Sequence, residues 1–233
     1  MPSRSTNWPV ARSFPALLIA IAGLVCIAPA EARDPLWDAL PWDQRLGVSW
    51  YEQRAAQGDL SAQLRAAQMH EEGIGTAADP AEAARWYAAA AEQGHPLALF
   101  KTAQAWQTGL LGAPDQPRAA ALYRAAADAG VGAASFNLAV MAETGQGLRR
   151  DRTKAAELYE QAWRQGLAKA ALNLGILQLS GGGDPLVAYG WLAAAARAEV
   201  PGAAAQRDRL GDLLGSEALS EAEALVLPPL GGG

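Results

Sequence analysis

The feature that most constrains the fold of this chain is an internal repeat of 36 residues, written four times. Five series of residues recur at this step in one register. They are Ala62, Ala98, Ala134 and Ala170; Gly73, Gly109, Gly145 and Gly181; Asp79, Asp115 and Asp151; Tyr87, Tyr123 and Tyr159; and Gly94, Gly130 and Gly166. Such a period is typical of repeat architectures, in which a unit buries its apolar face only against its neighbours.

Each repeat has the stop and start signals of two antiparallel helices. The first helix is predicted over about 62–72 and ends at Gly73, a residue that tolerates the left-handed cap conformation. Asp79 then fits an N-cap and Pro80 a first helical position, so the second helix is predicted over about 80–93. The sequence therefore predicts an all-α solenoid of helix-turn-helix repeats.

The register also predicts how the chain is divided. Trp50 and Tyr51 lie 36 residues before Trp86 and Tyr87, which predicts a lone capping helix before the array. The fourth repeat is three residues shorter in its loop. The predicted parts are a signal peptide over 1–32; a linker and capping helix over 33–58; four repeats within 59–200, at about 60–95, 96–131, 132–167 and 168–200; C-terminal capping helices over 201–227; and a disordered tail over 228–233.

The first 32 residues have the composition of an export signal. Arg4 and Arg12 give a positive region before an apolar run over 14–28, and Ala30 and Ala32 have the spacing of a cleavage site. We therefore expect a periplasmic or secreted protein. No second apolar run approaches the length of a membrane span, so none is expected after cleavage.

The single cysteine raises the alternative of a lipoprotein. Cys26 follows Val25, which is the wrong residue before a lipidated cysteine, so we favour the cleaved signal. Cleavage after Ala32 would leave no cysteine, and the mature fold would depend on packing rather than disulfides.

Charge excludes some classes of partner. The mature chain would keep 17 basic and 23 acidic residues, a formal charge of −6. Nucleic acids and anionic membranes bind clustered Lys and Arg, so neither is an expected partner.

The sequence offers no recognisable chemistry. The two histidines, His70 and His95, lie 25 residues apart and lack the spacing of metal ligands. The glycine pairs, such as Gly73 and Gly75, lack the Lys and Ser or Thr of a phosphate loop. We therefore predict no enzyme activity, no metal and no cofactor.

The third repeat resembles the Sel-one-like repeat, a relative of the tetratricopeptide repeat. The matching residues are Ala134, Phe136, Leu138, Ala139, Gly145, Gly147, Asp151, Ala155, Leu158, Tyr159, Ala162 and Gly166. The resemblance covers about residues 43–214 and implies a right-handed α-solenoid. It also implies a class of role: adaptor in an envelope complex, periplasmic regulator of a signalling receptor, or helper in exopolysaccharide assembly. The family usually has a Tyr near the end of the first helix, where this chain has His70, Trp106, Ala142 and Gln178.

Tetratricopeptide geometry places the first helices on the concave surface, which is the usual docking groove. Mapped onto this register, it predicts a polar, mildly acidic groove with aromatic anchors. The candidate residues are Gln68, His70, Glu71, Phe100, Gln104, Trp106, Gln107, Phe136, Val140 and Glu143. The alternative for each residue is an ordinary solvated helix face.

Two hypotheses for function stay open. The first is a periplasmic scaffold, or a regulator of an envelope complex, that binds another envelope protein in this groove. The alternative is an exopolysaccharide or cell-wall assembly factor whose aromatic residues stack on a glycan.

Overall fold

The structure is a computed structural model, and it describes residues 44–215 and residue 219. The predicted signal peptide, most of the linker after it, the disordered tail and nearly all of the second closing helix lie outside the described residues. Within the described residues the secondary structure is entirely helical, which confirms the all-α prediction.

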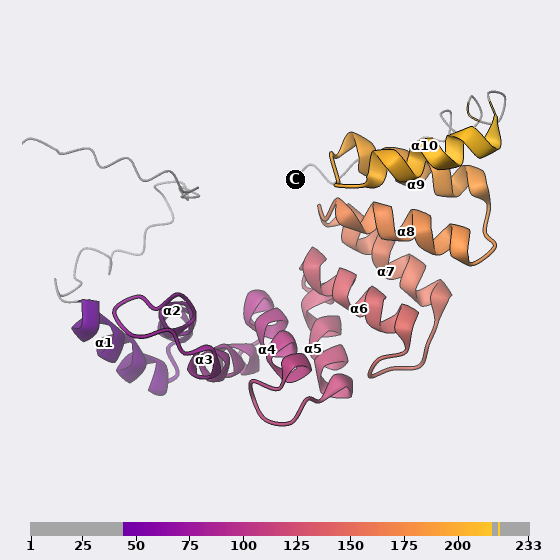
Figure 1. Cartoon of the computed structure of the whole chain (residues 1–233). Coiled ribbons are helices and arrows are strands. Elements are labelled where there is room, and N and C mark those ends of the chain that lie inside the picture. The colour runs from indigo at the N-terminus through magenta and orange to yellow at the C-terminus, as the bar shows by residue number, and fades with distance from the viewer. Residues whose placement is uncertain (1–43, 216–218, 220–233) are drawn as a thin grey trace, which may run out of the picture. The chain divides into compact units, whose positions relative to one another are not determined.

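Ten helices follow one another in the part of the chain that the structure describes (Figure 1). They are α1 (Gln44–Ala56), α2 (Leu60–Glu72), α3 (Pro80–Glu92), α4 (Pro96–Thr108), α5 (Gln116–Asp128), α6 (Gly132–Thr144), α7 (Arg152–Arg164), α8 (Lys169–Ser180), α9 (Pro185–Arg197) and α10 (Ala203–Leu214). Each packs against its neighbours in the chain. Helix α1 falls where the sequence predicts the N-terminal capping helix, and α2–α3, α4–α5, α6–α7 and α8–α9 are the hairpins of the four repeats.

The predicted caps explain where these helices begin and end. Gly73, Gly109 and Gly145 close α2, α4 and α6 in the left-handed conformation, with φ values of 71°, 86° and 81°. The Asp79 carboxylate accepts hydrogen bonds from the first-turn amides of Ala81 and Glu82, as an N-cap does. The 36-residue period is thus the spacing between equivalent helix-capping residues.

The fourth repeat ends its first helix differently. Gly181 has φ −96° at the end of α8, and the left-handed residue is Gly182, with φ 72°. The loop to Asp184 is three residues shorter than in the other repeats, so the chain must turn immediately after the helix. Asp184 still caps α9, through the amide of Leu186.

Alanine and tyrosine form the interior of the stack. Ala98, Ala134 and Ala170, one per repeat, are completely buried, and so are Tyr123 and Tyr159. Small side chains let the helix axes approach closely, while the tyrosine rings fill the space between the helices. One continuous core joins α4 to α9 and reaches Ala203 at the start of α10.

Glutamine side chains tie successive repeats together. Gln93, at the end of α3, donates to the main-chain oxygen of Gly58 at 3.0 Å. Gln165, at the end of α7, donates to the oxygen of Ala127 at 3.0 Å and accepts from the buried Ser135 hydroxyl. These bonds link the end of one hairpin to the preceding one and help to fix their stacking.

Candidate functional site

A row of side-chain hydrogen bonds crosses the first three hairpins in the same register. In each, a tyrosine hydroxyl of the second helix donates to a side-chain oxygen of the first helix, 16 residues earlier. The pairs are Tyr87 with Glu71 at 2.8 Å, Tyr123 with Gln107 at 2.8 Å, and Tyr159 with Glu143 at 2.9 Å. The repeat thereby holds one polar group of each first helix in a fixed orientation.

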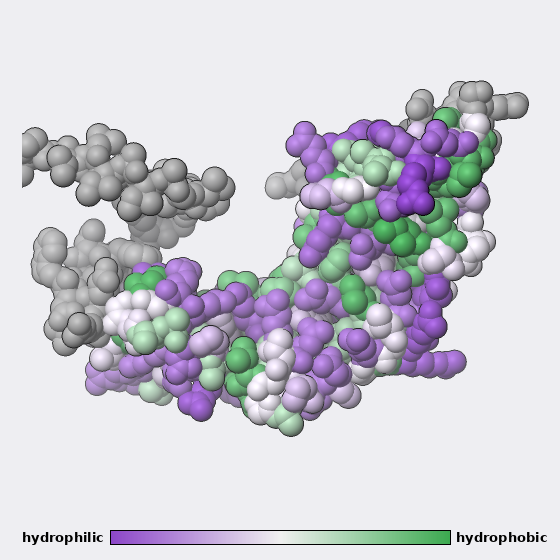
Figure 2. All heavy atoms as spheres, viewed as in Figure 1, coloured by the Kyte–Doolittle hydropathy of each residue, from purple (hydrophilic) through white to green (hydrophobic). Residues whose placement is uncertain are grey.

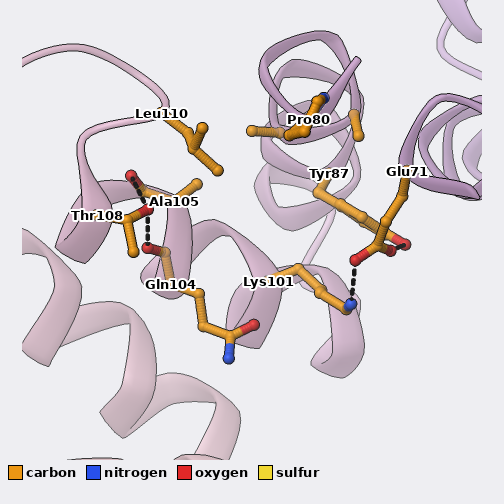
Figure 3. A pocket seen from close by; sticks show the side chains of 10 residues that line it. Glu71, Pro80, Tyr87, Lys101, Gln104, Ala105, Thr108 and Leu110 are labelled. Carbon is orange, nitrogen blue, oxygen red and sulfur yellow. Dashed lines mark hydrogen bonds and ion pairs between the residues drawn. The ribbon is translucent and has the colours of Figure 1, made fainter. Parts of the chain in front are cut away.

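The first helix of the following repeat adds a third residue to each of these pairs. Lys101 of α4 lies with its Nζ 2.6 Å from Glu71 Oε1, so α2 and α4 are neighbours here (Figure 3). Asn173 of α8 donates to Tyr159 Oη at 3.3 Å, and Asn137 of α6 has the same repeat position beside Tyr123. We call the resulting surface the ladder face; it comprises Glu71, Lys101, Gln107, Asn137, Glu143 and Asn173.

We call each tyrosine with its two side-chain partners a rung. The electrostatics of the first rung, which consists of Glu71, Tyr87 and Lys101, favour an ionised carboxylate beside a neutral phenol. Partial burial alone would raise the pKa of Glu71, but hydrogen bonds from Lys101 and Tyr87 and the Lys101 charge together lower it below its ordinary value of 4.5. Burial, followed by the contact with Glu71, raises the pKa of Tyr87 far above its usual range. Tyr87 therefore stays a hydrogen-bond donor at physiological pH.

An open pocket of about 280 Å³ adjoins this rung between α2, α3 and α4. Figure 3 shows the Glu71–Lys101 pair on one side of it and Gln104, Thr108 and Leu110 on the other. Thr108 donates to the main-chain oxygen of Gln104 at 2.8 Å. The pocket is suited to a single side chain of a bound segment rather than to a large ligand.

Several predicted groove residues lie on this side of the molecule. Glu71, Gln107 and Glu143 belong to the ladder face, and Gln104 lines the pocket. Gln68 lies half-buried on α2 and donates to Glu72 at 3.0 Å.

Val140 of α6, also half-buried, accepts a hydrogen bond from Thr144 through its main-chain oxygen. It occupies the repeat position of Gln68 and Gln104, one helical turn before Glu143.

The predicted phenylalanine anchors mainly support the tyrosines. Phe100 packs against Tyr123, and Phe136 against Tyr159, with ring centroids 5.9 and 5.5 Å apart. Both rings are half-buried, and the Lys169 ammonium lies 4.2 Å from the Phe136 ring centroid. Their role is to orient the phenols of the ladder face.

His70 and Trp106, which share one repeat position, are directed elsewhere. The His70 ring is buried and its Nε2 lies 2.8 Å from Glu52 Oε1 on α1. The Arg118 guanidinium of α5 lies 3.9 Å from the Trp106 ring centroid. Successive residues of a helix are rotated by about 100°, so a residue next to Glu71 or Gln107 faces another direction.

Some residues of this surface were missed by the sequence reasoning. Lys101, Asn137 and Asn173 form a series at the 36-residue step, and that step was the available signal. Ile176 and Leu179 of α8 are 43% and 38% exposed, at the repeat positions of Val140 and Glu143. Hydrophobic residues are visible at the surface among hydrophilic ones where α8–α10 lie (Figure 2).

Comparison with known proteins agrees with this repeat structure. A family model described as "Sel1 repeat" matches residues 36–59, 60–95, 96–131, 132–167 and 168–200. The chain belongs to the Sel1 repeat family. The resemblance seen in the sequence is thereby confirmed, and Sel1 repeat proteins are generally scaffolds for protein–protein interaction.

Two solved structures are similar to this Sel1 repeat protein. A Sel1 repeat protein from Oxalobacter formigenes is 25% identical over 82% of each chain, with a TM-score of 0.63. A protective antigen present in uropathogenic Escherichia coli strains and displaying an SLR fold is 22% identical over 78% of this chain and 56% of that one, with a TM-score of 0.45. No match was found among the curated proteins.

No helix among residues 44–215 is long and apolar enough to cross a membrane. Over the same stretch, no three His, Cys, Asp or Glu side chains converge as a metal site would require.

Proposed function

We propose that this Sel1 repeat protein is an exported scaffold whose ladder face binds a segment of another envelope protein. The observation that carries the proposal is the rung repeated in three successive hairpins, in which buried tyrosines orient surface carboxylate and amide groups. Groups held in place before binding lose little conformational entropy when a partner arrives, which favours recognition of an extended or helical segment.

Export is part of this proposal and rests on the N-terminal sequence. Arg4 and Arg12, the apolar run over 14–28 and the small residues at 30 and 32 are the features that support it. N-terminal sequencing of the mature protein from the envelope fraction checks it. The proposal expects a chain that begins near residue 33, and a mature chain that keeps Met1 in the cytoplasmic fraction would contradict it.

The glycan alternative is less well supported by the same surface. Stacking on sugars needs exposed aromatic faces, whereas Phe100 and Phe136 pack against tyrosines and Arg118 lies over Trp106. Polar groups in fixed positions suit a protein segment at least as well. We therefore place protein binding first and leave glycan binding as an outcome of the test.

A site-specific photocrosslink in cells tests the proposal. A photoreactive residue replaces Gln104 or Gln107, and the captured species is identified by mass spectrometry. The matched control replaces Arg85 of α3, whose side chain is 70% exposed and lies outside the ladder face. One protein captured from 104 and 107 and not from 85 is the expected result. Capture of glycan alone, or equal capture from all three positions, would contradict protein binding at this face.

A further inference from the structure

The first and third rungs carry the same carboxylate with different neighbours. In the first, Glu71 accepts from Tyr87 and pairs with Lys101 at 2.6 Å. In the third, Glu143 accepts from Tyr159, but the residue at the position of Lys101 is Asn173, which bonds to the tyrosine. The cation that completes the first rung is absent from the third.

No basic side chain of the described residues replaces that cation. Arg150 donates through Nε to the main-chain oxygen of Glu143 at 3.0 Å. The ion pairs formed within residues 44–215 do not include the Glu143 carboxylate. The Glu143 carboxylate, which is oriented and partly buried, is therefore available to pair with a cation of a binding partner.

The helix that supplies Asn173 to the third rung, α8, also carries two exposed aliphatic residues. Ile176 and Leu179 are large exposed residues at the repeat positions of Val140 and Glu143. Ile176 lies one helical turn beyond Asn173, which is the α8 member of the third rung. Exposed aliphatic residues are common on their own, but here they share α8 with Asn173, which bonds to the tyrosine that holds a carboxylate without an ion pair.

The residues at these two positions differ between the two ends of the array. At the repeat positions of Ile176 and Leu179, the first repeat has Gln68 and Glu71. The surface is thus polar and internally paired at α2, whereas α8 carries exposed aliphatic residues and the Glu143 carboxylate of α6 has no ion pair among the described residues. A partner with both a cation and aliphatic side chains would complement the second end.

We propose that Glu143, Ile176 and Leu179 form a subsite for a protein segment that carries an Arg or Lys beside aliphatic residues. The partner's cation takes the place that Lys101 holds in the first rung, and its aliphatic side chains cover Ile176 and Leu179. Arginine suits the position best, since its guanidinium can bond the carboxylate at two points. The proposal rests on the proposed function and adds the chemistry of the partner.

The chain itself supplies the most informative variant. Asn173→Lys would rebuild the pairing of the first rung inside the third, and the Glu71–Tyr87–Lys101 arrangement shows that the repeat accommodates it. Glu143→Gln removes the charge directly. Glu157→Gln of α7, whose side chain is 60% exposed, is the matched control outside the ladder face.

The probe is a panel of fluorescein-labelled amphipathic peptides with a Leu pair and one Arg at different spacings. Each has a partner peptide in which citrulline replaces Arg, which keeps the shape and removes the charge. Fluorescence anisotropy measures binding to the mature protein, and circular dichroism checks the fold of each variant. For the tightest arginine peptide we expect about tenfold weaker binding to Asn173→Lys and Glu143→Gln, and unchanged binding to Glu157→Gln.

The outcomes separate this inference from the proposed function. Equal binding of arginine and citrulline peptides, or no effect of Asn173→Lys and Glu143→Gln, would overturn the subsite. If no peptide binds while residue 107 still crosslinks to one protein, the subsite fails and the scaffold proposal stands. Absence of both peptide binding and crosslinking would overturn both.

Discussion

All four hairpins have the same arrangement of two helices, but the fourth differs from the first three in the contact that joins them. In the third, Tyr159 of α7 bonds to Glu143 of α6. In the fourth, the same position of the second helix is Leu192, which is completely buried against the first helix. The polar bond is thereby replaced by apolar packing, and the surface residue becomes Leu179.

A second exchange accompanies the first. The alanine of α6 at position 139 becomes Gly175 in α8, and a Cβ there would lie 2.9 Å from Leu192 Cγ and 3.1 Å from the oxygen of Ala188. The fourth hairpin is thus closed by close helix contact at a glycine. A change in the joining residue thus alters both the interior of a repeat and the chemistry of its surface.

Replacing Gly175 with a larger residue is expected to have the largest effect on stability. Gly175→Ala should lower the free energy of unfolding by about 1–2 kcal/mol, because overpacking against Leu192 and Ala188 outweighs the better helix propensity of alanine. Urea denaturation measures the change. Helix propensity alone predicts a gain of up to about 1 kcal/mol, so the sign of the change decides whether close contact closes the hairpin.

Removing the joining hydroxyl from the other hairpins should have a somewhat smaller effect. Tyr159→Phe and Tyr123→Phe should each cost about 1 kcal/mol of unfolding free energy or somewhat more, since Tyr159 loses its hydrogen bonds to Glu143 and Asn173 and Tyr123 loses its bond to Gln107, each at a buried ring. Tyr189→Phe is the control, because its hydroxyl has no hydrogen bond to another described residue. Equal losses of unfolding free energy in all three variants would show that the tyrosine hydrogen bonds to Glu143 and Gln107 add no stability of their own.

The pH dependence of the first rung should give the smallest effect. The pKa of Glu71 lies below 4.5, so its contribution to stability is present above pH 4.5 and is lost as the pH falls through the lowered value. The side chains of Glu71 and Lys101 are 40% and 28% exposed, so the pair contributes less than about 1 kcal/mol.

Unfolding free energies of wild type and Glu71→Gln, measured across this pH range, test that contribution. The two proteins should differ at neutral pH and converge in acid, whereas Glu157→Gln should follow the wild type throughout. A constant difference between Glu71→Gln and wild type at every pH would assign the loss to packing instead of charge.

The fold was predictable because its signals are local. Gly73 and Asp79 mark helix ends through their own conformational preferences, and the 36-residue step repeats them. The candidate surface was predictable only in part. The 36-residue step predicts that Glu71, Gln107 and Glu143 are equivalent positions. Their bonds to the tyrosines depend on how the two helices of a hairpin are rotated about their axes relative to each other.

The directions of the His70 and Trp106 side chains also depend on the rotation of their helices. His70 and Trp106 lie one residue before ladder positions, and that small offset turns them toward Glu52 and Arg118. The apolar end at Ile176 and Leu179 could have been found by extending the register of Val140 and Glu143 by one more repeat.

Photocrosslinking from residue 107, repeated in a protein altered at the apolar end, tests the central claim most directly. The altered protein carries Ile176→Ser and Leu179→Ser, and the control carries Leu97→Ser and Leu213→Ser, whose leucines are 46% and 83% exposed. If one segment lies along the ladder face, capture of the same identified protein should fall strongly in the first variant and persist in the control. Undiminished capture with Ser at 176 and 179 would contradict the account.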